Sequence, residues 1–377
     1  MRVGLDLTAL MEQATGVDRY LLALLEGLAA VDRENRYLVF INREDRERLP
    51  PLPRNFEVAR ASTRQRPVRL GWQQVGLPVV GAARRLDVVH SPSFILPVAD
   101  RRTRHLLSVH DLTSFSHPRL HEPLRRSWPY KAAVRASVRL AQCISVPTEA
   151  VRHELLRRFA RLDPARVRVI PYGVSGRFRP EAVERAPAIR RRLGLGSPYL
   201  LFVGTIQPRK NLELLLEAYR RLVVGQAIAE DLVIAGKPGW DYERVMTLAR
   251  TPPLAERVHL LGYVDDRLLP GLYAGARAVV YPSLEEGFGF PPLEAMACGV
   301  PVVSTSTPAL AENLAGAAEL APADRPEAVA SAIARVVGDE RLRERLRRDG
   351  LALSDRFRWE DVARQTIGCY RELARAG

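Results

Sequence analysis

Short apolar segments alternate with amphipathic helical segments along the whole chain of 377 residues. The first half contains predicted strands at residues 3–7, 37–41, 88–90, 106–109 and 143–146, and the second half at residues 199–203, 232–234, 258–261, 278–281 and 300–304. Strands that alternate with helices are typical of parallel, doubly wound sheets. Because single cores rarely grow beyond roughly 250–300 residues, we predict an α/β protein with two such domains.

A stretch rich in glycine and proline separates the two halves. Its turn-forming residues surround a charged segment and are Gly173, Gly176, Pro180, Gly194, Gly196 and Pro198. Such a composition over residues 172–198 is typical of an interdomain linker. We therefore predict an N-terminal domain at residues 1–171 and a C-terminal domain at residues 172–356, followed by a terminal helix within residues 357–377.

Composition narrows the class of protein. An apolar content of 47% excludes a disordered chain. Cys143, Cys298 and Cys369 lie far apart without histidine partners at ligand spacing, which disfavours a disulfide framework and structural zinc. The first residues include Arg2 and Asp6, and no apolar run reaches the length of a membrane span. We therefore expect a cytoplasmic protein without a signal peptide.

The formal net charge of +14 lies in the first half, where residues 1–180 contain 31 basic and 17 acidic residues. A basic surface attracts the phosphates of an anionic membrane, of a lipid-linked acceptor or of nucleic acid. Residues 121–140 interleave basic and apolar side chains, which suits an interfacial helix; a solvated basic helix with a buried apolar side is the alternative. These side chains are Leu124, Arg125, Arg126, Trp128, Tyr130, Lys131, Val134, Arg135 and Arg139. No nucleic-acid motif accompanies them, so nucleic acid is not a predicted partner.

The stretch EEGFGFPPLEAMACGVPVVS at residues 285–304 has the order of an anion-binding helix start. A strand leads into a glycine-rich turn, Pro291 and Pro292 stand at the first helical positions, and Gly299 is a favourable helix stop. The helix dipole and the backbone amides at this start favour a phosphate or diphosphate. These amides belong to Gly287, Phe288, Gly289 and Phe290.

Two glutamates flank this turn. Glu286 precedes the glycines, and Glu294 lies in the first turns of the helix. We expect both carboxylates to face one crevice and to accept hydrogen bonds from the hydroxyls of a sugar or ribose. In the alternative, Glu294 caps the helix and Glu286 is a solvated loop residue.

Basic residues follow the first strand of the second half. Gly204 leads into TIQPRKN, which places Arg209 and Lys210 at a strand–helix junction. Ligands of open parallel sheets bind at the carboxyl ends of the strands, so this pair is suited to a diphosphate. A solvated basic helix start is disfavoured, because cations oppose the dipole at a helix N-terminus.

Three other strand ends carry candidate residues. The turn of Gly262, Tyr263 and Val264 follows one strand, and an ordinary turn is an equally good interpretation of it. Gly16 precedes a helix expected at residues 20–30 and permits a close approach of a ligand to the backbone. His110 ends the strand at residues 106–109, beside Asp111, although a lone histidine at a strand end is more often structural.

The segment EGFGFPPLEAMACGVPVV resembles the donor-site signature of family-4 retaining glycosyltransferases of the GT-B fold. The resemblance is strong at residues 200–310 and weaker before residue 166. It implies two Rossmann-like domains that face a central cleft, an N-terminal domain that binds the acceptor and a C-terminal domain that binds the donor. It also implies that the terminal helix crosses back to the N-terminal domain.

The resemblance also implies residue roles. Glu294 would bind the nucleotide ribose and Glu286 the transferred sugar, and Arg209 and Lys210 match the basic pair of the family. Thr205 departs from the family, because many members have an arginine directly after the glycine. The implied backbone contact with the nucleobase comes from Gly262, Tyr263 and Val264. Gly16 would contact the donor, and His110 would approach the donor sugar near the reacting carbon.

Together with these features, the resemblance implies a glycosyltransferase that moves a hexose from a nucleotide diphosphate sugar to a hydroxyl of a glycan or lipid-linked acceptor, with retention. His110 and Glu286 are the candidate catalytic residues, and neither a metal nor a cofactor is expected. The segments VGTIQPRKN and LVIAGKPGW resemble bacterial mannosyltransferases of polysaccharide assembly, so GDP-mannose is the first donor candidate, ahead of UDP-glucose, UDP-N-acetylglucosamine and dTDP-rhamnose.

Two alternatives stay open. One is a nucleotide-sugar epimerase on the same fold, and the other is a nucleic-acid binder that only the net charge supports. For the enzyme, the basic first half adds an anionic membrane surface as a candidate partner, which corresponds to a peripheral position on the inner face of the membrane.

Overall fold

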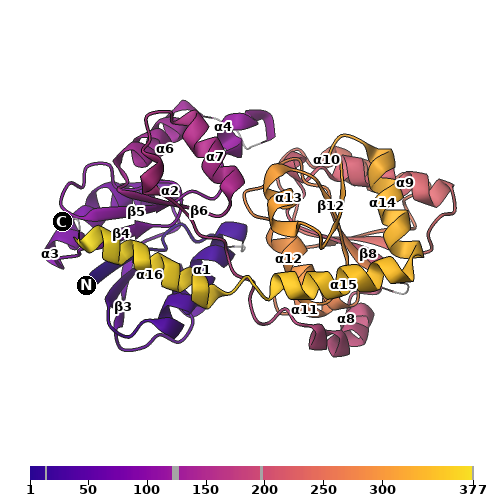
Figure 1. Cartoon of the computed structure of the whole chain (residues 1–377), viewed down its shortest axis with the longest axis horizontal. Coiled ribbons are helices and arrows are strands. Elements are labelled where there is room, and N and C mark those ends of the chain that lie inside the picture. The colour runs from indigo at the N-terminus through magenta and orange to yellow at the C-terminus, as the bar shows by residue number, and fades with distance from the viewer. Residues whose placement is uncertain (13–14, 121–126, 196–197, 376–377) are drawn as a thin grey trace. The chain divides into compact units, whose positions relative to one another are not determined.

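The computed structural model describes residues 1–377 except 13–14, 121–126, 196–197 and 376–377. The chain forms two compact units. Of the described residues, unit 1 contains Met1–Ser116, residues 127–173 and the C-terminal segment from Arg358, and unit 2 contains residues 117–120 and Val174–Phe357. Both units are built of parallel strands and helices (Figure 1), as the alternation in the sequence predicts.

Unit 1 has a parallel sheet of seven strands in the order β3-β2-β1-β4-β5-β6-β7. The strands are β1 (Arg2–Asp6), β2 (Arg36–Asn42), β3 (Phe56–Ser62), β4 (Val88–Ser91), β5 (Arg104–Ser108), β6 (Cys143–Val146) and β7 (Val167–Val169). The helices are α1 (Gly16–Val31), α2 (Arg66–Gly71), α3 (Leu77–Ala83), α4 (Thr113–Ser116), α6 (Trp128–Leu140), α7 (Glu149–Arg158) and α16 (Trp359–Arg375), with the short helices η1 (Arg43–Arg48), η2 (Trp72–Gly76) and η4 (Pro164–Arg166).

Unit 2 has a parallel sheet of six strands in the order β10-β9-β8-β11-β12-β13. The strands are β8 (Tyr199–Val203), β9 (Asp231–Ala235), β10 (Val258–Gly262), β11 (Ala278–Tyr281), β12 (Val302–Thr305) and β13 (Glu319–Ala321). The helices are α8 (Ala186–Arg192), α9 (Leu212–Val224), α10 (Glu243–Ala249), α11 (Leu269–Ala274), α12 (Phe290–Ala297), α13 (Pro308–Leu314), α14 (Pro326–Gly338) and α15 (Glu340–Ser354), with the short helices η3 (Pro118–Leu120), η5 (Pro180–Arg185) and η6 (Pro208–Lys210).

All ten predicted strands are present. Every residue of β8 and of β11 is buried, as expected for central strands of a sheet covered by helices on both faces. Three strands were not predicted. β7 and β13 have only three residues each, and β3 is an edge strand in which Glu57 and Arg60 are exposed.

The predicted linker is wrong in part. Residues 180–192 form η5 and α8, and both helices pack against α11 within unit 2. The apolar side of this segment is buried through Ala182, Ala186 and Ile189. The sequence pattern did not indicate these helices, because prolines and charged residues are frequent in the segment. Gly196 lies outside the described residues.

Helix α16 belongs to unit 1 and lies beside α1 (Figure 1). Trp359, Ala363 and Tyr370 are buried in this contact region. Gly27 of α1 permits the close approach, because a Cβ atom there would lie 2.7 Å from the Trp359 carbonyl oxygen. The C-terminal helix therefore returns to the N-terminal unit, as the family resemblance implies.

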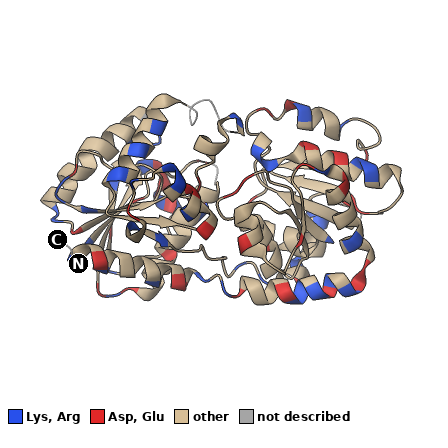
Figure 2. Cartoon of the chain, turned by 45° about the horizontal axis from the view of Figure 1, so that its top comes forward, with Lys and Arg blue, Asp and Glu red and all other residues tan. Residues whose placement is uncertain are grey.

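The basic segment at residues 121–140 is described only from Ser127 onward, so Leu124, Arg125 and Arg126 lie outside the described residues. Helix α6 buries Val134 and Val138 in the core of unit 1. This burial is what the solvated basic helix predicts for these two residues, whereas Trp128, at the start of α6, is 76% exposed, as the interfacial helix predicts. Figure 2 shows basic residues on α6, whereas both signs alternate along α15. Within the described residues, no helix has both the length and the apolar character needed to cross a bilayer.

Candidate functional site

The loops that follow β8 and β9 run side by side at the carboxyl edge of the unit 2 sheet. The amide of Ile206 donates to the Lys237 carbonyl at 2.9 Å, and the amide of Gly239 donates to the Ile206 carbonyl at 2.9 Å. Gly236 has to be glycine here, because a Cβ atom would lie 1.8 Å from the Gly204 carbonyl oxygen. The glycines of both segments thus allow two backbones to meet where ligands of such sheets bind.

The loop after β11 is tied to η6. The amide of Leu284 donates to the Arg209 carbonyl at 2.9 Å, and the Arg209 guanidinium donates to the Glu285 carbonyl at 2.8 Å. These contacts are possible because β8 and β11 are neighbours in the sheet, although the two loops are 76 residues apart in the chain.

An ion cluster joins the two loops. Glu286 accepts from Arg209 at 2.6 Å through Oε2 and from Lys210 at 2.5 Å through Oε1. The Tyr281 hydroxyl donates to the same Oε1 at 2.9 Å and accepts a hydrogen bond from the Lys210 ammonium. We call these four residues the Glu286 cluster. The structure thereby brings together three predicted site residues, and it adds Tyr281, whose place at the end of an apolar strand gave no sign of function.

Three residues of the Glu286 cluster are buried, the Arg209 side chain is 15% exposed, and the cluster carries a net positive charge of one. Glu286 is 8% exposed and Lys210 7% exposed. Burial by itself raises the pKa of Glu286, but the charges of Arg209 and Lys210 outweigh it and lower this pKa to about 2. Burial and the neighbouring Glu286 charge raise the pKa of Tyr281 well above its usual range. At neutral pH the carboxylate is therefore ionised and the phenol keeps its proton.

Helix α12 begins as predicted, at Phe290 after the glycine-rich turn. Gly289 adopts a left-handed conformation with φ of 89°, and Gly299 ends the helix with φ of 72°. The Phe288 carbonyl accepts from the Asn313 side chain at 2.7 Å, which anchors the turn to α13. The turn at residues 287–290 is thus held in one shape by its neighbours.

Glu294 lies in the second turn of α12 and is 3% exposed. The Tyr273 hydroxyl, on α11, donates to its Oε2 at 2.9 Å. The helix-cap alternative for Glu294 is therefore wrong, since the first turn of α12 contains no acidic residue. The alternative of a solvated Glu286 is wrong as well, because that carboxylate is buried and ion-paired.

Two family models match the chain. Residues 14–175 match the model described as Glycosyltransferase Family 4, and residues 187–351 match the model described as Glycosyl transferases group 1. The chain is 30% identical to O-antigen chain mannosyltransferase B of Escherichia coli over 372 residues. This alignment covers 95% of this chain and 96% of that protein. The chain belongs to the family-4 type of glycosyltransferases.

Other relatives and solved structures agree with this family. The chain is 31% identical over 285 residues to D-inositol 3-phosphate glycosyltransferase of Segniliparus rotundus, covering 73% of this chain and 61% of that protein. Sucrose-phosphate synthase from Thermosynechococcus elongatus superposes with a TM-score of 0.80 at 23% identity, over all of both chains. Anabaena HepE in complex with UDP-glucose has a TM-score of 0.76 at 19% identity, over 99% of this chain and 100% of that chain. The GT-B fold is thereby confirmed.

The remaining candidate of unit 2 in this glycosyltransferase is the turn after β10. Gly262 has a left-handed φ of 64°, and its carbonyl accepts from the Gly236 amide at 2.8 Å. Val264 is buried, whereas Tyr263 is 48% exposed. This turn therefore adjoins the loop after β9, at the same edge of the sheet as the Glu286 cluster.

His110 and Gly16 belong to unit 1. The His110 Nε2 donates to the Pro92 carbonyl at 2.9 Å, and Nδ1 lies 2.5 Å from the Tyr172 hydroxyl. Burial raises the pKa of Tyr172 well above its usual range, so this hydroxyl keeps its proton. Both ring nitrogens of His110 thus have partners within unit 1, and Tyr172, 62 residues away, is a partner that the sequence did not indicate.

Gly16 is the first residue of α1, which begins four residues earlier than predicted. The buried Asp18 sets this start, because its carboxylate accepts from the Met11 amide at 2.5 Å and from the Thr15 amide at 2.9 Å. Asp111, beside His110, accepts from the Thr113 amide at 3.1 Å. The sequence did not single out Asp18, although a Thr-x-x-Asp start is a known capping pattern.

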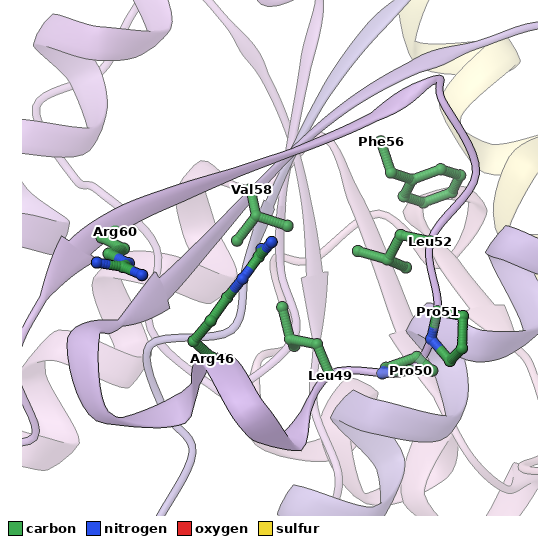
Figure 3. Close-up of a pocket in the computed structure, with 8 residues that line it drawn as sticks. All are labelled: Arg46, Leu49, Pro50, Pro51, Leu52, Phe56, Val58 and Arg60. Atoms are coloured by element: carbon green, nitrogen blue, oxygen red, sulfur yellow. The ribbon is translucent and has the colours of Figure 1, made fainter.

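A pocket of about 850 Å³ lies elsewhere in unit 1, between η1 and the edge strand β3 (Figure 3). Its lining combines apolar side chains with Arg46 and Arg60. No predicted site residue lines this pocket, and both arginines are exposed, as many are in this arginine-rich chain.

Proposed function

We propose that this glycosyltransferase transfers a mannosyl group from GDP-mannose to a hydroxyl of a glycan or lipid-linked acceptor, with retention at the anomeric carbon. The observation that carries the proposal is the Glu286 cluster, where two cations and one carboxylate meet at the carboxyl ends of β8 and β11. The cations suit a diphosphate, and the carboxylate suits the hydroxyls of the sugar beside it.

The chemistry explains why two cations are needed. Breaking the bond between the sugar and the diphosphate leaves an oxocarbenium-like sugar and a leaving group with additional negative charge. Arg209 and Lys210, once they have turned from Glu286 to the bound diphosphate, stabilise this charge as it develops. The backbone amides of residues 287–290 and the dipole of α12 add to this stabilisation. Because these groups supply the positive charge, we propose that the reaction requires no divalent metal.

The other predicted residues complete the donor site. We assign the nucleotide ribose to Glu294 and the nucleobase to the turn of Gly262, Tyr263 and Val264. Gly16 and His110 are proposed to contact the donor from unit 1, with His110 near the reacting carbon. If His110 acts in this way, its hydrogen bonds to Pro92 and Tyr172 hold the imidazole in one orientation.

The choice of mannose rests on the relative named O-antigen chain mannosyltransferase B, which aligns over nearly the whole chain. A cytoplasmic location with peripheral attachment to the inner face of the membrane stays a proposal that rests on the charge of the first half. The epimerase and the nucleic-acid binder are not favoured, because the relatives named above are transferases.

A donor screen tests the proposal. Purified protein is incubated with GDP-mannose, UDP-glucose, UDP-N-acetylglucosamine or dTDP-rhamnose, with and without a hydroxyl acceptor, and the released nucleoside diphosphate is measured. We expect turnover of GDP-mannose, and nuclear magnetic resonance of the product should show a retained anomeric configuration. Use of the UDP sugars without use of GDP-mannose would overturn the donor assignment. Conversion of the donor alone into its epimer would support the alternative enzyme class.

A further inference from the structure

The Tyr281 hydroxyl is held between two buried charged side chains. The residue is 1% exposed, and its ring stacks on Phe202 with centroids 6.1 Å apart. Its hydroxyl closes a ring of hydrogen bonds, since it accepts from Lys210 and donates to Glu286, while Lys210 also donates to Glu286. Because the phenol keeps its proton, the Tyr281 hydroxyl can only donate to the carboxylate.

The proposed function requires this ring to change. Without a ligand, Glu286 holds both cations that the donor diphosphate would engage. An ammonium or guanidinium that turns toward phosphate oxygens weakens its contact with the carboxylate, because its donors and its charge are then shared. The Glu286 carboxylate would therefore lose part of its contacts with Arg209 and Lys210 when the donor is bound, which is when its position relative to the sugar matters.

Tyr281 is the partner that need not move. It sits at the end of β11, five residues before Glu286, and its backbone carbonyl accepts from the Ser304 hydroxyl of β12 at 3.0 Å. Its ring is fixed by the stacking on Phe202 and by the strand that carries it. The hydroxyl is bound to Oε1, and Oε2 is the oxygen that Arg209 holds.

We propose that Tyr281 is a positioning residue that holds Oε1 of Glu286 when Arg209 and Lys210 turn to the diphosphate, and thereby leaves Oε2 for a sugar hydroxyl. This inference rests on the proposed function. Once Lys210 has turned away from its hydroxyl, Tyr281 acts through Glu286 and touches no reacting atom, so its effect depends on the sugar and not on the nucleotide.

The test is Tyr281→Phe, which removes one oxygen atom from a buried ring. We expect kcat/KM for the sugar donor that the wild type uses to fall about 10- to 100-fold, the range for a lost hydrogen bond to a charged group. The affinity for the matching nucleoside diphosphate, measured by calorimetry, should change less than about threefold. The acid limb of the activity profile should move to higher pH, since a carboxylate with one donor fewer has a higher pKa.

Tyr199→Phe is the matched control. Tyr199 is also buried in the sheet of unit 2, and its hydroxyl donates to the Leu272 carbonyl at 2.7 Å, away from Glu286. It should lower the melting temperature by no more than Tyr281→Phe does, because the lost hydrogen bond is to a neutral carbonyl, and it should leave the catalytic pH profile unchanged. A general loss of packing would affect both variants and would weaken nucleoside diphosphate binding as well as transfer.

Two further variants separate the hydroxyl from the ring. Introducing 3-fluorotyrosine at position 281 keeps the hydroxyl and should keep activity within about threefold of wild type. This variant still tests the role of the hydroxyl if Tyr281→Phe does not fold. On the background of Glu286→Gln, Tyr281→Phe should have little additional effect, because residues that act through one contact are not additive.

The outcomes are distinct. A wild-type protein that binds and turns over no nucleotide sugar would contradict the proposed function itself. The role of Tyr281 would be overturned if the wild type is active and Tyr281→Phe has the same kcat/KM and the same acid limb of the pH profile. The role of Tyr281 would also be overturned if the protein with 3-fluorotyrosine at position 281 lost as much activity as Tyr281→Phe. The same holds if Tyr281→Phe lost nucleoside diphosphate affinity and transfer activity in parallel.

Discussion

Glu286→Gln removes the negative charge at the centre of the Glu286 cluster, and the structure sets the size of the effect. The surroundings lower the pKa of this carboxyl from its usual 4.5 to about 2. Each unit of pKa corresponds to about 1.4 kcal/mol, so the ionised form contributes about 3 kcal/mol to the stability of unit 2 at pH 7. Since the folded-state pKa is the lower one, this stability is present above about pH 4.5 and is lost as the pH falls toward 2.

The variant should therefore be less stable than wild type by about 3 kcal/mol at pH 7 and by about 2 kcal/mol at pH 3.5. Hydrogen exchange measured by mass spectrometry on peptides that cover β11 and α12 reports this free energy for unit 2 alone. Glu217→Gln is the control, because Glu217 pairs with Arg220 and Arg221 on the surface, and such pairs contribute about 0–1 kcal/mol. An equally stable Glu286→Gln protein at pH 7, or a deficit that does not change with pH, would refute the reasoning.

Three further predictions concern the proposed donor site. Lys210→Met should weaken nucleoside diphosphate binding about 10- to 100-fold in calorimetry with an unchanged circular dichroism spectrum, and unchanged affinity would remove Lys210 from the site. Gly289→Ala should lower the stability of unit 2 by about 1–3 kcal/mol, because φ is 89° and the new Cβ atom would lie 2.5 Å from Leu310; Gly338→Ala, with open space around it, should not destabilise. Transfer activity should be unchanged after dialysis against EDTA, and a loss that Mg²⁺ or Mn²⁺ restores would contradict the metal-free mechanism.

The sheets could be predicted because their signal is local. The buried strands at residues 199–203, 278–281 and 143–146 have the predicted bounds, since each is a short apolar run next to turn residues. β3 was not predicted because an edge strand tolerates charged residues such as Glu57 and Arg60, which interrupt the apolar pattern. The sequence predicts a linker where η5 and α8 lie, because proline and charge occupy their exposed sides while Ala186 and Ile189 face inward.

The Glu286 cluster could be predicted only in pieces. Local patterns placed Arg209 and Lys210 in one loop and Glu286 in another, but their contact depends on β8 and β11 being neighbours. Strand order of this kind is a long-range property, because β9 and β10 lie between the two strands in the chain. Tyr281 and Tyr172 were missed for the same reason, because the partners of their hydroxyls are distant in the chain. Lys210 donates to Tyr281, and His110 contacts Tyr172.

A crystal structure of the protein with bound GDP, supported by calorimetry of nucleoside diphosphates, tests the central claim most directly. We predict the diphosphate at the carboxyl ends of β8 and β11, with Arg209 and Lys210 about 3 Å from phosphate oxygens. The Tyr281 hydroxyl should remain on Glu286. A nucleotide bound elsewhere, with the ion pairs of Arg209 and Lys210 to Glu286 unchanged, would contradict the account.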